Sequence, residues 1–418
     1  MDLSGKLSDK ISGKPSGNLS GKRIVLGLSG GIACYKAAEL TRALVQAGAS
    51  VQVVMTDAAS HFMTAVTMQA LSGHAVYGDQ WDARIANNMA HIDLTRQADM
   101  IVIAPCSADF LFKLAHGVAD DLLSTLCLAR PLTLPLLVAP AMNVEMWQNR
   151  ATGRNVQQLR DDGVQILGPA SGVQACGETG MGRMLEAAQL LAEIHAAFQP
   201  KILAGKRVLI TAGPTYEAID PVRGITNLSS GKMGYAIALA AYQAGAEVLM
   251  VSGPTALQVP YGVQCIAVQS AQQMYDAVHA HVKGQDLFVA VAAVADWRVT
   301  NVSAQKLKKD ADGRTPHLEF SANPDILASV AARPQPPYCV GFAAESENLL
   351  QHGAEKRVRK GVPLLVGNIG HQTFGKDKNA LVLFDEQGHT VIPEADKLEL
   401  AHHLVAQFAT RLATWTPS

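Results

Sequence analysis

The chain has 418 residues, a formal net charge of −1, 48% hydrophobic residues and only 5% aromatic residues. This length is too great for a single hydrophobic core, so we expect two domains, or perhaps three. Without a basic surplus the chain is not expected to bind nucleic acid, and no uninterrupted apolar run is long enough to span a membrane.

Residues 1–22 are rich in Gly, Ser and Lys and lack the apolar core of a secretory signal, so we expect a flexible N-terminal extension. The six cysteines are scattered, with no C-x-x-C pair and no zinc-ligand spacing. In a chain of this size such cysteines are typical of reduced thiols, which predicts a soluble, cytoplasmic protein.

Two segments of the chain resemble each other, residues 22–54 and residues 206–251. Each has the pattern of a buried strand, a glycine-bearing turn, an amphipathic helix that ends at Gly48 or Gly245, and a second strand. These are two βαβ units, one at the head of each half. We therefore expect two doubly wound, mainly parallel-sheet Rossmann-like α/β domains, covering residues 23–199 and 200–418, with ligands at the carboxyl ends of the strands.

The remaining elements follow in chain order. In the first half we expect further strands at 100–104, 135–139 and 164–168, and helices at 33–47, 109–116, 120–129 and 185–198. In the second half we expect strands at 207–211, 247–252, 287–292, 339–342 and 364–368, and helices at 231–244, 271–282, 324–332 and 349–360.

Short polar residues and glycines follow the first three strands of the first half. Ser29-Gly30-Gly31 sits between strand and helix, where free N–H groups and the helix dipole favour a phosphate. The spacing is not that of a dinucleotide site, and a monophosphate such as that of FMN suits the short loop better. Glycines there could instead only allow close helix–strand packing. The polar residues expected at the same edge are Thr56, Ser107 and Asp109, and Met142 adds a soft side chain after the next strand.

Residues 169–184 form a glycine-rich segment that contains one cysteine, Cys176. Glycine at this density costs backbone entropy and buries nothing, which favours a functional loop over a connecting one. The alternative is a surface turn with an incidental cysteine.

A second anion site is predicted where Ser229-Ser230-Gly231 begins a helix. It is not a P-loop, because Lys232 is followed by Met instead of Ser or Thr. The plausible anions are the phosphates of a nucleotide or the phosphate of a substrate.

Together these motifs carry a family resemblance. S-G-G-I-A, P-x-S-A-D, P-A-M-N and A-C-G-x-x-G-x-G-R-M resemble the flavin-containing cysteine decarboxylases. From residue 23 to about 415 the chain is similar to the bifunctional phosphopantothenoylcysteine decarboxylase/phosphopantothenate–cysteine ligase family of coenzyme A biosynthesis. One departure is Cys106, where relatives usually have alanine, which we expect to alter packing near the flavin and not chemistry.

In the first half the resemblance implies an FMN-dependent decarboxylase. FMN would oxidise the substrate thiol, carbon dioxide would leave, and an acid would protonate the neighbouring carbon. By motif, His91 is the base, Asn143 binds the substrate carboxylate, Arg183 contacts the substrate, and Cys176 is the proton donor. A thiol with a pKa of ~8.5 is protonated at neutral pH, which suits an acid. Structural alternatives remain for three of them: His91 in a helix start, Asn143 as a helix cap, and Arg183 as a surface charge.

In the second half the resemblance implies a CTP-dependent ligase that joins cysteine to 4′-phosphopantothenate through an acyl-cytidylate, with Mg²⁺ accompanying the nucleotide. Asn227 would hold the acyl-cytidylate, Lys306 would stabilise phosphoryl charge, and Arg223 would bind the substrate phosphate. Taken alone, the lysines of this half are most simply solvated surface. The nucleotide site would be shaped by Ala292, Asp296, Pro324, Asp325, Ile326, Leu327, Phe342, Lys356 and Lys360.

For assembly the resemblance implies decarboxylase trimers and ligase dimers, which could combine in a dodecamer. Two other functions are less consistent with the residues present. A catalytically inactive flavin-binding regulatory protein is disfavoured because Cys176, His91 and Asn143 are all present. A nicotinamide dehydrogenase is disfavoured because neither first strand is followed by G-x-G-x-x-G.

Overall fold

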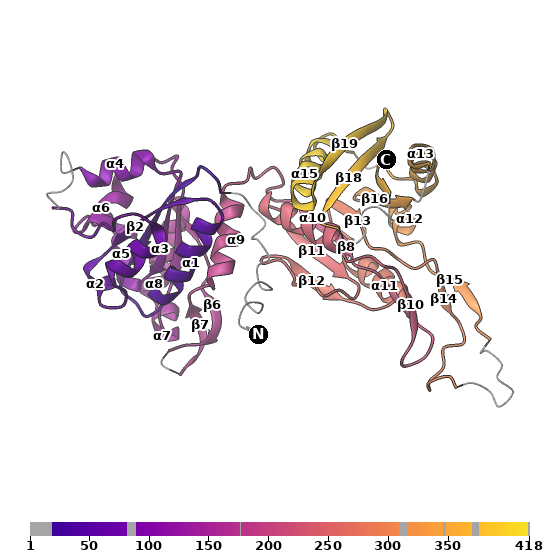
Figure 1. The fold of residues 1–418 in the computed structure, drawn as a ribbon, viewed down its shortest axis with the longest axis horizontal. Helices are drawn as coiled ribbons and strands as arrows, with labels where there is room; N and C mark the ends of the chain where they lie inside the picture. Colours follow the sequence, from indigo (N-terminus) through magenta and orange to yellow (C-terminus); the bar gives the residue numbers. More distant parts are fainter. Residues whose placement is uncertain are drawn as a thin grey trace, which may run out of the picture. The chain divides into compact units, whose positions relative to one another are not determined.

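The computed structural model describes residues 19–81, 89–175, 177–308, 317–345, 348–369 and 376–416. The chain divides after Phe198 into two compact units, which are described separately below. Both are mixed α/β units built on a mainly parallel sheet, as predicted (Figure 1).

The first unit is organised around a five-stranded parallel sheet in the order β2-β1-β3-β4-β5. The central strands are buried apolar runs, because helices cover both faces of a doubly wound sheet. All five strands were predicted to within a few residues, and they are β1 (Arg23–Leu28), β2 (Ser50–Met55), β3 (Met100–Cys106), β4 (Leu136–Pro140) and β5 (Gln165–Ile166).

The helices of this unit include all four that were predicted and several that were not. Among those not predicted is α8, a helix of 12 residues that is mostly polar and buries only Thr152, Val156 and Leu159. The helices are α1 (Cys34–Gln46), α2 (Asp57–Ser60), α3 (Ala65–Ser72), α4 (Ala90–Gln97), α5 (Ala108–His116), α6 (Leu122–Ala129), α7 (Val144–Gln148), α8 (Arg150–Asp161) and α9 (Ala187–Ala197).

The glycine-rich segment forms an antiparallel hairpin, β6 (Ala170–Val173) with β7 (Thr179–Arg183). Two of its glycines are positions of close approach. A Cβ at Gly182 would lie 2.4 Å from the carbonyl oxygen of Met142, and one at Gly180 would lie 2.7 Å from Val144. The backbone N–H of Met142 also donates to the carbonyl oxygen of Gly182, at 3.0 Å. The glycines therefore let the hairpin pack directly on residues 142–144.

The second unit is built on an eight-stranded sheet in the order β12-β11-β8-β13-β16-β17-β18-β19. Five of these strands were predicted; β12 and the final antiparallel pair, β18 and β19, were not. The strands are β8 (Arg207–Ala212), β11 (Glu247–Ser252), β12 (Gln264–Ala267), β13 (Leu287–Ala290), β16 (Tyr338–Glu345), β17 (Leu364–Ile369), β18 (Lys378–Asp385) and β19 (Gly388–Asp396).

Two layers of helices cover this sheet and define two cores. On one face α10 (Lys232–Gln243) packs beside the unpredicted C-terminal helix α15 (Lys397–Ala413). The other face carries the three further predicted helices. These are α11 (Ala271–His281), α12 (Ile326–Ala331) and α13 (Leu349–Lys360).

Two short antiparallel ribbons extend from the second unit (Figure 1). They pair β9 (Tyr216–Ala218) with β10 (Gly224–Thr226), and β14 (Trp297–Val299) with β15 (Phe320–Ala322). The ribbon residues are partly apolar yet open to solvent, notably Trp297 and Phe320. Among the described residues, no helix has the length and apolar character needed to cross a membrane.

Gly182→Ala should destabilise the first unit by ~1–3 kcal/mol, because the added Cβ meets a backbone oxygen and the residue has φ of +133°. Gly153→Ala is the matched control. It lies inside α8 with no atom within 4 Å of the added Cβ, so it should stabilise by about 0.5–1 kcal/mol. Urea unfolding of the two variants measures both effects. Equal stabilities would contradict the close packing of β7 on residues 142–144.

Candidate functional site

The ends of β1 and β3 are joined by one buried hydroxyl. Ser29 Oγ donates to the carbonyl oxygen of Pro105 at 2.9 Å and accepts from the backbone N–H of Ser107 at 2.8 Å. Parallel strands end at the same sheet edge, so this bond fixes the two loops that follow them side by side. The structure therefore brings Ser29 and Ser107 together, although the Ser29 hydroxyl is already fully engaged.

The loop from Gly30 to Ala33 leaves a cluster of backbone donors at this edge. No described residue accepts a hydrogen bond from these four N–H groups. A Cβ at Gly31 would meet nothing within 4 Å, whereas one at Gly30 would lie 2.6 Å from the Cβ of Ala58. The loop is thus packed against residue 58 on one side and open on the other, which fits an anion at the start of α1.

Two hydroxyls cap neighbouring helices at the same edge. Thr56 accepts from the N–H of Ala59 at the start of α2, and Ser107 accepts from the N–H of Phe110 at the start of α5. Asp109 lies one residue inside α5 and is largely exposed, 4.0 Å from Lys113. The hydroxyl, amide and carboxylate groups expected to surround a flavin phosphate and ribityl chain therefore occupy one edge of the sheet.

Asn143 caps a helix, as its structural alternative predicted. Its Oδ1 accepts from the N–H of Met146, and its Nδ2 donates to Glu145 Oε2 at 2.6 Å. The Asn143–Glu145 bond is exposed, so another carboxylate could take the place of Glu145. Met142 precedes the cap and packs beside the first-unit core.

Arg183, at the end of β7, belongs to a three-residue charge cluster. Glu186 Oε1 accepts from Arg183 at 2.6 Å and from Lys36 Nζ at 2.9 Å. Lys36 lies on α1 with only 3% of its side chain exposed, and it also donates to the carbonyl oxygen of Met184 at 2.8 Å. The hydrogen bond from Lys36 lowers the pKa of Glu186. This cluster ties the hairpin to α1, the helix that follows the loop from Gly30 to Ala33.

Lys36 was missed from the sequence. It occupies the buried face of α1 in register with Leu40 and Leu44, at i, i+4 and i+8. A lysine at an apolar position of a helix is the signal that could have found it, because such a cation must have a buried partner.

Three other predicted residues of the first unit have less structural support. The side chain of His91, in the first turn of α4, has no hydrogen bond, ion pair or ring contact with any described residue. Cys176 lies outside the described residues. Cys106 is fully buried in the first-unit core, where burial raises the pKa of its thiol well above the ordinary value. A neutral buried thiol fits the expectation that Cys106 affects packing alone.

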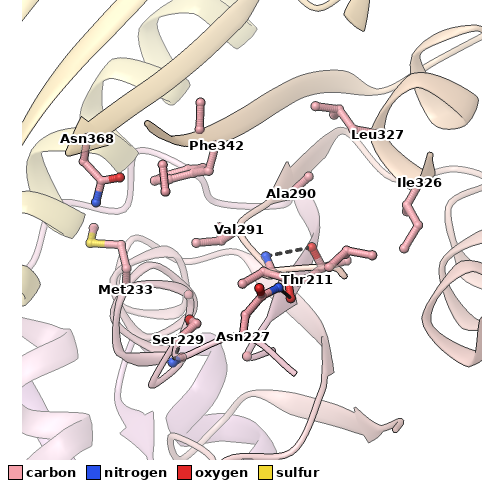
Figure 2. Close-up of a pocket in the computed structure, with 18 of the residues that line it drawn as sticks. Thr211, Asn227, Ser229, Met233, Ala290, Val291, Ile326, Leu327, Phe342 and Asn368 are labelled. Carbon is pink, nitrogen blue, oxygen red and sulfur yellow. Dashed lines mark hydrogen bonds between the residues drawn. The ribbon is translucent and has the colours of Figure 1, made fainter. Parts of the chain in front are cut away.

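The second unit has a pocket of about 620 Å³ at the carboxyl edge of its sheet (Figure 2). Its lining includes the ends of β8, β13 and β16 and the start of α10. The structure brings together there every residue expected in the ligase site except Arg223 and Lys306. The predicted residues that line the pocket are Asn227, Ala292, Asp296, Pro324, Asp325, Ile326, Leu327, Phe342, Lys356 and Lys360.

The pocket has two sides because alternate residues of a strand face opposite ways. Val291 and Phe342 pack toward the core below α10 and α15, whereas Ala292 and Ala343 pack toward the core below α12. In Figure 2 the labelled side chains separate in the same way, with Met233, Phe342 and Asn368 opposite Ile326 and Leu327. Asn227 lies between them and is held by a 2.9 Å bond from its Nδ2 to the carbonyl oxygen of Ala293.

The two predicted lysines of α13 are neutralised by carboxylates. Lys356 Nζ lies 3.1 Å from Glu345, and Lys360 is hydrogen-bonded to Asp325. Burial, the largest single effect, opposes ionisation of Asp325, but the hydrogen bonds from Lys360 and the Ala328 N–H, together with the charges of Lys360 and Arg359, lower the pKa of Asp325. These lysines are therefore ordered pocket residues, not freely solvated surface charges.

Arg223 and Lys306 lie outside the pocket lining. Arg223 donates to the buried carboxylate of Asp220 and to the carbonyl oxygen of Leu307. Burial would raise the pKa of Asp220, yet the bonds from Arg223 and from backbone N–H groups hold it well below its usual range. Lys306 is exposed next to Leu307. The backbone N–H of Leu307 donates to Asp220, and Arg223 donates to the carbonyl oxygen of Leu307, so Lys306 lies near the turn that joins β9 and β10.

Polar residues of the lining that were not among the predicted site residues include Lys232, Asn368, Asn379 and Lys397. Asn379 and Lys397 belong to β18 and α15, the C-terminal elements that were not predicted. No group of three or more His, Cys, Asp or Glu in the described part of the chain is arranged to hold a metal ion.

Comparison with known proteins covers both units. Residues 12–199 match the family model described as Flavoprotein, and residues 203–412 match the DNA/pantothenate metabolism flavoprotein C-terminal domain. The chain is 50% identical to the coenzyme A biosynthesis bifunctional protein CoaBC of Vibrio cholerae over 388 residues, 92% of this chain and 97% of that protein. The chain belongs to this bifunctional family.

Other members of the CoaBC family align over a similar length. The Escherichia coli protein is 45% identical over 400 residues, 94% of this chain and 98% of its own. Among solved structures, the C-terminal domain of a CoaBC protein is 37% identical, covers 51% of this chain and 100% of its own, and has a TM-score of 0.45.

Lys36→Met should lower the free energy of unfolding of the first unit by ~1–3 kcal/mol, because it removes a buried donor that satisfies the Met184 carbonyl and Glu186. The matched control is Arg42→Met on the same helix, where the side chain is exposed and the change should be within ~0.5 kcal/mol. Urea unfolding measures both. If the two variants were equally stable, the Lys36 contacts would not hold the hairpin.

Proposed function

We propose that the protein carries out two consecutive steps of coenzyme A biosynthesis. Cysteine is ligated to 4′-phosphopantothenate with CTP through an acyl-cytidylate, and the product is decarboxylated to 4′-phosphopantetheine with FMN. The observation that carries this proposal is the second-unit pocket, which gathers nearly all the residues expected of a ligase in a chain related end to end to bifunctional proteins. The inactive regulatory alternative has no comparable support.

FMN fits the carboxyl edge of the first-unit sheet. Its phosphate suits the unpartnered N–H groups of residues 30–33 and the open space beside Gly31. When bound, FMN supplies the two-electron oxidation of the substrate thiol. The residues that would hold it are Ser29, Gly30, Gly31, Thr56, Ser107, Asp109 and Met142.

The chain's own groups would bind the substrate and move its protons. Asn143 Nδ2 would turn from Glu145 to the substrate carboxylate, and Arg183 would hold the substrate beside the hairpin. His91 would accept a proton from the substrate, and the Cys176 thiol would deliver one to carbon after carbon dioxide has left. Protonation by a neutral thiol requires that Cys176 stay uncharged at the working pH.

In the ligase step the pocket would orient a carboxylate toward the α-phosphate of CTP. Asn227 would hold the acyl-cytidylate, and its amide is already oriented by Ala293. Lys306 would stabilise phosphoryl charge and Arg223 the substrate phosphate, both arriving from outside the described pocket lining. Mg²⁺ would enter with the triphosphate, and the Lys356–Glu345 and Lys360–Asp325 pairs would shape the cytidine site.

We also propose a homo-oligomeric, cytoplasmic enzyme, with decarboxylase trimers and ligase dimers combined in a dodecamer. Solvent-exposed apolar side chains on the ribbons of the second unit, including Val222, Leu228, Trp297 and Phe320, favour a partner surface there. The five described cysteines are all free thiols, in keeping with a reducing compartment.

The purified protein should show a flavin absorption band, and it should release pyrophosphate over many turnovers only when CTP, cysteine and 4′-phosphopantothenate are all present, because without cysteine the reaction stops at the acyl-cytidylate. Spectroscopy and a coupled pyrophosphate assay measure both. A flavin-free protein without this pyrophosphate release would overturn the proposed function.

Cys176→Ser should keep bound FMN and release carbon dioxide, yet stop at the oxidised enethiol, because a serine hydroxyl is a far weaker acid than a thiol. Mass spectrometry of the product distinguishes this species from 4′-phosphopantetheine. Ligation serves as the internal folding control. Normal formation of 4′-phosphopantetheine would remove Cys176 from the role of acid.

Asn227→Asp should reduce ligation by about 10²-fold, because a carboxylate replaces the amide donor facing the carbonyl oxygen of Ala293. Decarboxylation of supplied 4′-phosphopantothenoylcysteine should continue at the wild-type rate. Loss of both activities would indicate misfolding, and retention of both would exclude Asn227 from the mechanism.

A further inference from the structure

Asp220 is a charged residue in the turn between β9 and β10, and none of its side-chain surface is exposed. Its Oδ1 accepts hydrogen bonds from the backbone N–H groups of Val222 and Arg223, both at 2.8 Å. Its Oδ2 accepts from Arg223 Nε at 2.9 Å, from Arg223 Nη2 at 2.5 Å and from the backbone N–H of Leu307 at 3.1 Å. Five N–H donors therefore surround one buried carboxylate, which is how a charge is tolerated away from water.

These bonds join two segments that are far apart in the sequence, the β9–β10 turn and the loop of residues 303–307. Arg223 Nη2 donates to the carbonyl oxygen of Leu307 at 2.7 Å. A second link lies nearby, where the backbone N–H of Ser303 donates to the carbonyl oxygen of Ile219 at 3.1 Å. The buried carboxylate and its arginine thus hold the backbone of Leu307 at both its N–H and its carbonyl oxygen, and the loop is fixed to the turn.

Arg223 and Lys306 are the two expected ligase residues that lie outside the pocket lining, and both are attached to this carboxylate. The pairing uses Nε and Nη2 of Arg223, and no described residue accepts a hydrogen bond from its Nη1. The arginine side chain is 48% exposed, so Nη1 is open to an anion from solvent. Lys306 is exposed and immediately precedes Leu307, whose backbone is fixed. One buried group therefore determines the place of both cations.

Formation of the turn alone does not explain a carboxylate at position 220. A turn of this kind needs only Oδ1 as an acceptor for the N–H groups of Val222 and Arg223, and an asparagine side chain offers the same acceptor. Burial of a charge is costly unless the charge is paired. The second oxygen and the negative charge are engaged by the Arg223 guanidinium and by Leu307, so these contacts are what the carboxylate adds.

We propose that Asp220 is a positioning residue of the ligase step, which fixes the orientation of Arg223 for the substrate phosphate and the place of Lys306 for the reaction at the α-phosphate. The inference rests on the proposed ligase function and adds to it a residue that touches no substrate. Asp220 acts only through the guanidinium of Arg223 and the backbone of Leu307. Loss of its charge should therefore impair the use of 4′-phosphopantothenate and leave the affinity for the nucleotide unchanged.

Steady-state ligation by full-length, flavin-loaded Asp220→Asn tests the proposal. The amide keeps the shape and the Oδ1 acceptor, but it places an NH2 group where Oδ2 accepts from Arg223 and Leu307. We expect kcat/KM for 4′-phosphopantothenate to fall about tenfold or more, whereas KM for CTP stays near the wild-type value. The matched control is Asp286→Asn, because Asp286 accepts from a backbone N–H and a lysine at the amino end of β8, the opposite edge of the sheet. Its ligation constants should equal those of the wild type.

A double-mutant cycle separates positioning from a general loss of stability. If Asp220 acts through Arg223, the double variant Asp220→Asn/Arg223→Met should be clearly less impaired than the product of the two single effects predicts. Circular dichroism and urea unfolding report whether each variant is folded. Fully multiplicative effects would overturn the proposal, as would wild-type constants in a folded Asp220→Asn.

Hydrogen exchange of the wild type provides a test that does not depend on a folded variant. The backbone N–H of Leu307 should be protected, although the neighbouring residues of the loop are exposed, because it donates to a buried carboxylate. Exchange at the rate of an unstructured chain would overturn the link between Asp220 and the loop. An inactive wild type with a protected Leu307 N–H would instead overturn the proposed ligase function.

Discussion

Both units depend on close packing, permitted by glycine, at the start of the first helix. In the second unit Gly234 of α10 faces the Cβ of Ala212 at the end of β8, and in the first unit Gly30, in the loop before α1, faces the Cβ of Ala58 in α2; a Cβ on either glycine would meet its neighbour at 2.6–2.7 Å. Backbone donors at the helix start are thereby brought against the ends of the strands, where polar side chains gather. The space left by these two glycines, more than any particular polar residue, allows ligands to reach this edge.

The parts of the fold that sequence could predict are those with strong periodicity. Buried strands such as β3 and β8, and helices with an apolar stripe such as α1 and α10, follow from residue pattern alone. The antiparallel pair β18–β19 was not predicted, although β18 carries an apolar run from Ala380 to Phe384; the mostly exposed β19 has no such run. The hairpin β6–β7 was missed because its glycines indicate conformational freedom, whereas the structure uses Gly182 for close contact.

The candidate sites were predictable to a similar degree. Motif residues such as Asn227, Asp296 and Phe342 line one pocket because each follows a parallel strand or its neighbouring loop. Lys36 could not be placed from sequence because its hydrogen-bond partners lie 148–150 residues away. Asn379 and Lys397 could not be placed because they belong to β18 and α15, which were not predicted. Arg223 and Lys306 carry the family pattern, yet within the described chain they lie beside Asp220 and Leu307, outside the pocket.

Strand alternation has a further consequence for chemical inhibition of the second unit. Phe342 and Ala343 are adjacent in sequence but belong to opposite walls of the cavity, as do Val291 and Ala292. A point substitution therefore remodels one wall and leaves the other intact. A compound that contacts both walls would therefore keep its contacts with the unaltered wall after a single substitution.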